Sequence, residues 1–124
     1  MAITLIIVDD QPSIRHAVKE CLSFEHEVTV VGEASDGAEA LALARDLRPD
    51  VVLTDIKMAN MDGFGVAEGV RRALPGTRVV ILSVYDTAAN RERARKAGAA
   101  FISKHEPAEA LLAAIIGESS LEKA

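Results

Sequence analysis

Short apolar segments alternate with amphipathic segments along the whole chain. Segments 3–8 and 51–54 are almost continuously apolar and of strand length, which is typical of strands buried on both faces. In segment 12–23 the apolar residues recur at helical spacing, and Pro12 suits the first turn of that helix. The complete pattern predicts strands at 3–8, 28–31, 51–54, 78–83 and 101–103, and helices at 12–23, 37–47, 64–74, 87–97 and 107–116.

The strict alternation of strands and helices predicts an α/β fold. Strands that are apolar on both faces and separated by helices favour a parallel sheet covered on both sides. With right-handed crossovers, five such units predict a doubly wound five-stranded parallel sheet of order 2-1-3-4-5, a flavodoxin-like (βα)5 arrangement. Ligands of such sheets bind at the carboxyl ends of strands 1 and 3, where the strand order reverses.

Polar residues and glycines mark several of the predicted helix ends. Asp36 has the character of an N-cap, and Glu39 follows it at the spacing of a capping box. Gly98 is placed to end the fourth helix in the left-handed conformation. Asp62 and Gly63 are interpreted as turn and cap residues rather than ligands.

Length and composition predict a single domain with an aliphatic core. The chain has 124 residues, of which 49% are hydrophobic and only 3% are aromatic. We expect one domain over residues 1–117 and a polar tail or the start of a linker over 118–124. Cys21 lies on the apolar stripe of the first helix, so we expect it in the core.

The charge pattern argues against several classes of partner. The net charge is −5 and no long basic stripe is present, so this segment is not expected to contact nucleic acid. The fourth helix is basic, and a solvated face is the default reading there, with a partner-docking surface as the alternative. The chain contains one cysteine, no apolar run of membrane-spanning length and no signal-peptide pattern, so we expect a cytoplasmic domain without membrane contact.

Three aspartates follow the two central strands of the predicted sheet. Asp9 and Asp10 come directly after segment 3–8, and Asp55 follows segment 51–54. Clustered carboxylates repel each other unless a cation lies among them. Mg²⁺ prefers oxygen ligands of this kind, so the pattern indicates a hard divalent metal at this edge.

Two further side chains are predicted to reach the same edge. Ser83 ends the fourth strand and Lys104 follows the fifth. A hydroxyl and an ammonium beside a metal-bound carboxylate suit the binding of a phosphoryl group. Asp55 would then be the nucleophile that forms an aspartyl-phosphate, assisted by Ser83 and Lys104.

These motifs, in this order, resemble the receiver domain of two-component response regulators. The resemblance covers essentially the whole chain. Outside the site residues, the sequence is most similar to receivers of NarL/FixJ-type transcription regulators. The motifs are Val8-Asp9-Asp10, the segment 55–63, Ser83 after 80–82 and Lys104 after 101–103, with segments 31–40 and 78–83 carrying the NarL/FixJ similarity.

The resemblance implies a role for each residue of the metal and phosphate site. Asp55 is the implied phosphoacceptor, and Lys104 bridges its carboxylate and the phosphoryl group. Mg²⁺, or Mn²⁺, is implied to bind Asp10, Asp55 and the main-chain carbonyl of Lys57, while Asp9 acts largely through water.

The resemblance also implies a switch and its partners. Ser83 and Phe101 resemble the family's switch pair, in which the hydroxyl moves toward the phosphoryl group and the aromatic ring turns inward. The surface of the fourth helix, fifth strand and last helix is the implied output face and a possible homodimer contact. The implied phosphodonor is a sensor histidine kinase or a histidine phosphotransfer protein, and the resemblance implies a signalling switch rather than an enzyme.

Three alternatives remain open at this point. The domain could control a DNA-binding output domain absent from this chain, or act as a stand-alone receiver through protein contacts. A degenerate receiver would bind partners without phosphorylation, which the intact set of five site residues disfavours. A flavodoxin-like FMN-binding domain is disfavoured because the chain has almost no aromatic residues.

Overall fold

The computed structural model describes residues 2–117 and contains one five-stranded parallel sheet of order β2-β1-β3-β4-β5. This order and the alternation of strands and helices confirm the predicted fold class. The predicted tail, 118–124, lies outside the described residues. The elements are β1 (Ile3–Val8), α1 (Pro12–Leu22), β2 (Val28–Ala34), α2 (Gly37–Leu47), β3 (Val51–Thr54), α3 (Gly63–Ala73), β4 (Arg78–Ser83), α4 (Ala88–Lys96), β5 (Ala100–Ser103) and α5 (Ala108–Ile116).

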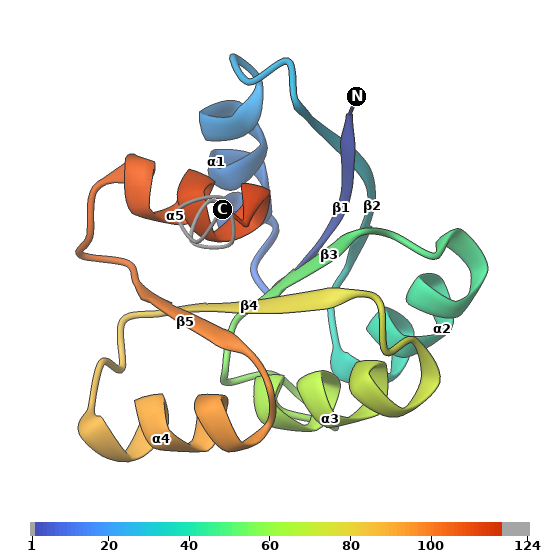
Figure 1. The fold of residues 1–124 in the computed structure, drawn as a ribbon, viewed down its shortest axis with the longest axis vertical. Coiled ribbons are helices and arrows are strands. Elements are labelled where there is room, and N and C mark those ends of the chain that lie inside the picture. Colours follow the sequence, from blue (N-terminus) through green and yellow to red (C-terminus); the bar gives the residue numbers. More distant parts are fainter. Residues whose placement is uncertain (1, 118–124) are drawn as a thin grey trace.

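The helices cover the sheet in two layers (Figure 1). Helices α1 and α5 pack on one face, where residues such as Leu5 and Ile115 form one buried cluster. Helices α2, α3 and α4 pack on the other face, where Ile6, Val66 and Ala94 belong to a second cluster. Successive residues of β1 therefore point into different cores, which explains why its sequence is apolar throughout. No helix among residues 2–117 has the length and hydrophobicity to cross a membrane.

Strand β2 extends three residues beyond its predicted end at residue 31. Its pairing with β1 shifts by one residue, from Leu5 opposite Val30 to Ile6 opposite Gly32. A side chain at Gly32 would crowd Leu43 of α2, so glycine lets the helix approach the strand closely. Gly32 and Glu33 interrupt the apolar run, and for this reason the strand predicted from the sequence ends at residue 31 instead of residue 34.

The predicted helix caps are confirmed, with one difference in detail. The Asp36 carboxylate accepts a hydrogen bond from the Glu39 amide at 2.8 Å, as the capping box requires. Glu39 reaches back to the amide of Ser35, one residue before the cap, at 2.6 Å. Gly98 adopts φ +79°, and the Asp62 carboxylate accepts from the Gly65 amide at 2.9 Å, so both perform their predicted roles.

The prediction that Cys21 lies in the core is wrong. Helix α1 buries only Leu22 fully, and Cys21 is exposed. Cys21 lies beside a groove between α1 and α5 that Ile14 and Leu111 also line. The helical period places Cys21 at the margin of the apolar stripe, and the spacing between the two helices leaves that margin uncovered.

Candidate functional site

The ends of β1 and β3 bring two of the predicted carboxylates to the same edge of the sheet. The Asp55 amide donates to the Val8 carbonyl at 3.1 Å, so the chain leaves both strands side by side. The Asp9 side chain is only 5% exposed and the Asp55 side chain 13% exposed. Both carboxylates are thus largely withdrawn from water at the switch point of the strand order.

Lys104 joins these two carboxylates from the end of β5. Its Nζ lies 3.9 Å from an Asp9 oxygen and 3.8 Å from an Asp55 oxygen, and its side chain is 23% exposed. The Lys104 amide donates to the Ser83 carbonyl at 2.9 Å, which fixes the start of its loop against β4. The structure therefore places Lys104 close to Asp9 and Asp55, where one cation partly neutralises two carboxylates.

The environment of Asp9 disfavours its charged form. Burial raises the pKa of the Asp9 carboxyl, and the charges of Asp55 and Asp10 raise it further. The Gln11 amide, which donates to the Asp9 carboxylate at 3.0 Å, and the Lys104 ammonium act in the opposite direction without cancelling the shift. An added cation near Asp9 would relieve this unfavourable balance.

The other two predicted metal ligands differ from Asp9 in burial. Asp10 and Lys57 are both exposed, whereas Asp9 is buried. Within residues 2–117, no three acidic, histidine or cysteine side chains form a cluster able to hold a metal by themselves. The donor set still fits Mg²⁺, which binds through one or two carboxylates and keeps several waters. The fit rests on the carboxylates of Asp9 and Asp55. Their two negative charges are opposed by the single positive charge of Lys104, so one negative charge remains for a cation to neutralise.

Gly63 shapes the loop that follows the candidate phosphoacceptor. Its amide donates to the Ile56 carbonyl at 2.8 Å and closes the loop between β3 and α3. A Cβ atom at this position would overlap the main-chain carbonyl of Asp55. The sequence predicts a turn or cap residue at Gly63 but gives no sign of its close packing on Asp55.

The predicted switch residues lie on neighbouring strands. Ser83 is completely buried at the end of β4, and its hydroxyl accepts a hydrogen bond from the Tyr85 amide at 3.0 Å. Phe101 in β5 is partly buried and packs on the core between the sheet and α2, α3 and α4. Arg91 of α4 lies over its ring, with the guanidinium carbon 4.9 Å from the ring centre.

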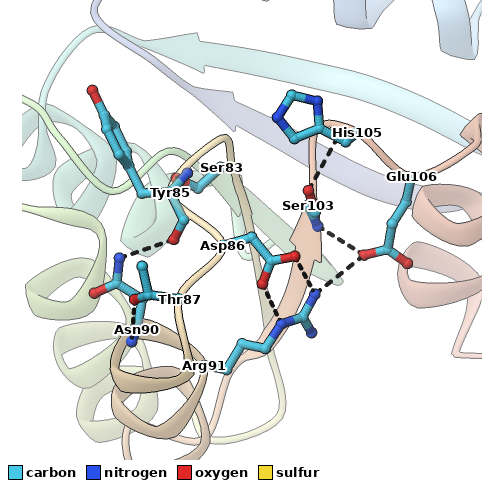
Figure 2. Close-up of polar contacts among 9 residues, drawn as sticks. All are labelled: Ser83, Tyr85, Asp86, Thr87, Asn90, Arg91, Ser103, His105 and Glu106. Carbon is cyan, nitrogen blue, oxygen red and sulfur yellow. Dashed lines mark hydrogen bonds and ion pairs between the residues drawn. The ribbon is translucent and has the colours of Figure 1, made fainter.

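Two loop contacts near the site were missed by the sequence analysis. Lys57 places its ammonium 4.3 Å from the centre of the Tyr85 ring, so it spans the space between the loops after β3 and β4. Arg91 pairs with Asp86 and Glu106 (Figure 2). Lys57 and Glu106 lie far along the chain from their partners, and Asp86 precedes Arg91 at a spacing that belongs to no known motif. Local sequence patterns therefore do not predict these contacts.

A comparison with models of protein families identifies the family of this chain. The model of the response regulator receiver domain matches residues 5–116. This chain belongs to that family. It has the sheet order and CheY-like architecture of a receiver domain, and its relatives are response regulators of the NarL and VraR type.

Individual relatives point to the same branch of the family. The nitrate/nitrite response regulator NarL of Escherichia coli K12 is 35% identical over 113 residues, which cover 90% of this chain and 52% of that protein. A NarL transcriptional regulatory protein of Mycobacterium tuberculosis H37Rv is 43% identical over 98 residues, which cover 79% of this chain and 45% of that protein. The chain therefore spans about half the length of these relatives.

A solved structure agrees with the sequence relatives. The signal receiver domain of NarL from Mycobacterium tuberculosis superposes with a TM-score of 0.85 at 38% identity, and the match covers 94% of this chain and 98% of that domain. The chain is thus a receiver domain of two-component response regulators of the NarL/LuxR type, a class of signalling switches.

Proposed function

We propose that this receiver domain accepts a phosphoryl group on Asp55 from a histidine of a sensor kinase or a phosphotransfer protein. The observation that carries this proposal is the convergence of the Asp55 and Asp9 carboxylates with Lys104 at the switch point of the sheet. Asp55 is the better nucleophile of the two carboxylates, because its side chain is more exposed than that of Asp9.

The transfer step makes one bond and breaks one bond. A carboxylate oxygen of Asp55 attacks phosphorus, and the phosphorus–nitrogen bond of the phosphohistidine breaks. The electron pair of that bond stays on the imidazole, which takes up a proton from solvent. Lys104 offsets the charge of the phosphoryl oxygens, and the Ser83 hydroxyl turns to donate a hydrogen bond to one of them.

A divalent cation completes this charge balance. Asp10, Asp55 and the Lys57 carbonyl would hold Mg²⁺ or Mn²⁺, with Asp9 acting through water. When bound, the cation supplies positive charge against the transferring phosphoryl group. The raised pKa of Asp9 supports the proposal, because burial and then the charges of Asp55 and Asp10 disfavour the ionised carboxyl, and a nearby cation would offset that cost.

Signal output would follow from movement of Ser83 and Phe101. Ser83 ends β4, and Phe101 lies in the neighbouring strand β5. The residue of β4 directly opposite Phe101 is Ile81, two positions before Ser83. A hydroxyl drawn toward the phosphoryl group frees space that the aromatic ring can enter. The α4–β5–α5 surface would then shift between two packings and bind a partner or a second copy of this domain.

The domain would act within a larger regulatory system. We assign residues 1–117 to the receiver and residues 118–124 to the start of a linker or tail. The match covers only 52% and 45% of the two NarL relatives, which are named as regulators, and this supports control of a DNA-binding output domain. A stand-alone receiver that acts through protein contacts is the alternative. In either case the domain is a switch rather than an enzyme acting on an external substrate.

Incubation with phosphoramidate and Mg²⁺, followed by intact-mass measurement, tests the proposal. We expect one added phosphoryl group in the wild type and none after chelation of the metal. Asp55→Asn keeps the shape of the side chain and should abolish the addition. Asp50→Asn is a matched control, because Asp50 hydrogen-bonds Thr4 at the opposite end of the sheet. Equal phosphorylation of wild type and Asp55→Asn would refute the proposal.

A further inference from the structure

Arg91 lies at the centre of a polar network that joins two loops of the switch region (Figure 2). Its Nη2 donates to an Asp86 oxygen at 3.0 Å, and its Nε contacts the other oxygen of the same carboxylate. The same Nη2 lies 3.6 Å from a Glu106 oxygen. Asp86 belongs to the loop between β4 and α4, and Glu106 to the loop between β5 and α5.

The Glu106 carboxylate connects this network to the end of β5, directly before Lys104. It accepts a hydrogen bond from the Ser103 amide at 2.8 Å, directly before Lys104 in the chain. The Ser103 hydroxyl accepts from the His105 amide at 3.1 Å, so the backbone on both sides of Lys104 is held. A displacement of Glu106 would therefore change the support of the lysine that contacts Asp55.

The loop between β4 and α4 is fastened at its other end to Ser83. The Tyr85 amide donates to the Ser83 hydroxyl at 3.0 Å, and the Tyr85 carbonyl accepts from the Asn90 side chain at 3.0 Å. The next residue is Asp86, whose carboxylate forms a bidentate ion pair with Arg91. The loop is thus held between the candidate switch hydroxyl and Arg91.

Arg91 also holds the other candidate switch residue. Its guanidinium lies over the Phe101 ring at 4.9 Å from the ring centre, within the range of a cation–π interaction. One side chain thereby contacts Phe101 and both loops. The other arginines of α4 have local or separate partners, since Arg95 pairs with Glu92 in the same helix and Arg93 lies over Phe64.

We propose that Arg91 is a positioning residue that latches the resting form of this receiver, by fastening Asp86, Glu106 and Phe101 to α4 at once. The proposal rests on the function proposed above and extends it, because it names the contacts that phosphorylation at Asp55 must break. Movement of Ser83 releases Tyr85, and movement of Phe101 removes the ring beneath the guanidinium. The latch sets how large a fraction of the unphosphorylated protein already adopts the switched arrangement.

The latch is weak enough to be opened by phosphorylation. The side chains of Arg91, Asp86 and Glu106 are 45%, 35% and 37% exposed, so each ion pair contributes little by itself. Several contacts on one guanidinium should together change the equilibrium between the two arrangements by about two- to tenfold. Exposed ion pairs are screened by salt, so this bias should decrease at high ionic strength.

Tyr85 provides a direct readout of the latch that does not require phosphorylation. It is the one tyrosine of the chain, which has no tryptophan, and it lies in the latched loop. Acrylamide quenching of its fluorescence should be compared between wild type, Arg91→Gln and Arg95→Gln. The Arg95 variant is a matched control, because the same substitution in the same helix leaves both loops untouched.

We expect Arg91→Gln to increase quenching at low salt, with Arg95→Gln unchanged from wild type. High salt should raise quenching in the wild type toward the level of Arg91→Gln. Identical quenching in the Arg91 and Arg95 variants, with folding of both confirmed by circular dichroism, would overturn the latch. Glu106→Gln offers a second test, since it removes one anchor without changing Arg91, and it should increase quenching to a smaller extent.

Phosphorylation kinetics with phosphoramidate form the second arm of the experiment. We expect Arg91→Gln to be phosphorylated about two- to tenfold faster than wild type and Arg95→Gln at the wild-type rate. Absence of any phosphorylation in the wild type would refute the proposed function, while the quenching data still decide the latch. A normal rate and normal quenching in Arg91→Gln would refute the latch and leave the proposed function intact.

Discussion

Replacing Lys104 with methionine tests the electrostatic balance of the candidate site. The substitution keeps a long, unbranched side chain and removes only the charge and its hydrogen-bonding capacity. In the wild type, the ammonium lies 3.9 Å from Asp9 and 3.8 Å from Asp55. We therefore expect Lys104→Met to destabilise the metal-free protein by leaving two carboxylates without their shared cation.

The magnitude follows from these distances and from the exposure of the three side chains. At an effective dielectric constant of about 20, each attraction near 4 Å amounts to about 4 kcal/mol. The two carboxylate oxygens cannot be farther apart than both distances combined, so their repulsion is at least about 2 kcal/mol on the same scale. Desolvation offsets part of the attraction. The side chains of Asp9, Asp55 and Lys104 are 5%, 13% and 23% exposed, so their ion pairs lie between the surface and the buried class. We therefore expect Lys104→Met to lower the free energy of unfolding by about 2 kcal/mol.

Denaturant unfolding in the presence of a chelator measures this loss. Lys96→Met is the matched control, because Lys96 is exposed and has no ion pair among residues 2–117. Saturating Mg²⁺ should stabilise Lys104→Met more than wild type, since the metal then supplies the missing positive charge. Adding Asp55→Asn to Lys104→Met should recover most of the lost stability by removing the repulsion.

Two results would refute this reasoning about Lys104. One is an unfolding free energy of Lys104→Met equal to that of Lys96→Met, which would mean that the ammonium does not neutralise the carboxylates. The other is a failure of Asp55→Asn to recover stability in the Lys104→Met background, which would mean that the loss has another origin.

The site supports three more predictions. Gly63→Ala should destabilise the fold by about 2 kcal/mol or more, measured by denaturant unfolding, because its Cβ overlaps the Asp55 carbonyl; a neutral effect would contradict the packing. The pKa of Asp9 is raised by burial, so its charged form costs stability above that pKa. Metal-free Asp9→Asn should therefore have a higher free energy of unfolding than wild type at pH 7. This difference should shrink as pH falls through the raised pKa toward the ordinary value of 3.8. A difference that grows on acidification would contradict the prediction. Val84 follows Ser83 and Lys57 lies two residues after Asp55, so we expect both side chains beside the path by which water would reach the aspartyl-phosphate. Val84→Ala and Lys57→Asn should therefore change the lifetime of the phosphorylated protein; unchanged decay in both would exclude this role.

Much of the fold could be predicted because local signals and tertiary structure agree. Strands β1, β3 and β4 begin and end at their predicted residues, since most of their residues are apolar and buried. The end of β2 was missed because Gly32 is selected by the close approach of α2, a tertiary contact that no local pattern records. Cys21 was misplaced for a related reason, because helical periodicity gives direction but not the spacing between α1 and α5.

The candidate site shows the same division between local and tertiary information. The sequence order of parallel strands is enough to bring Asp9, Asp55 and Lys104 together, because their strands end at the same edge. The basic fourth helix, in contrast, was interpreted as a solvated face. The partners of Arg91 depend on how two loops meet above that helix, and loop conformation has no periodic signal in the sequence.

Chemical mapping of the phosphorylated residue tests the assignment of Asp55 most directly. Borohydride reduces an aspartyl-phosphate to homoserine and leaves unmodified aspartates unchanged, so peptide mass spectrometry of the reduced protein locates the phosphoryl group. After incubation with phosphoramidate and Mg²⁺, we expect homoserine at Asp55 and at no other position. Homoserine at Asp9 or Asp10, or a phosphoryl group that resists reduction and maps to Ser83, would contradict the assignment.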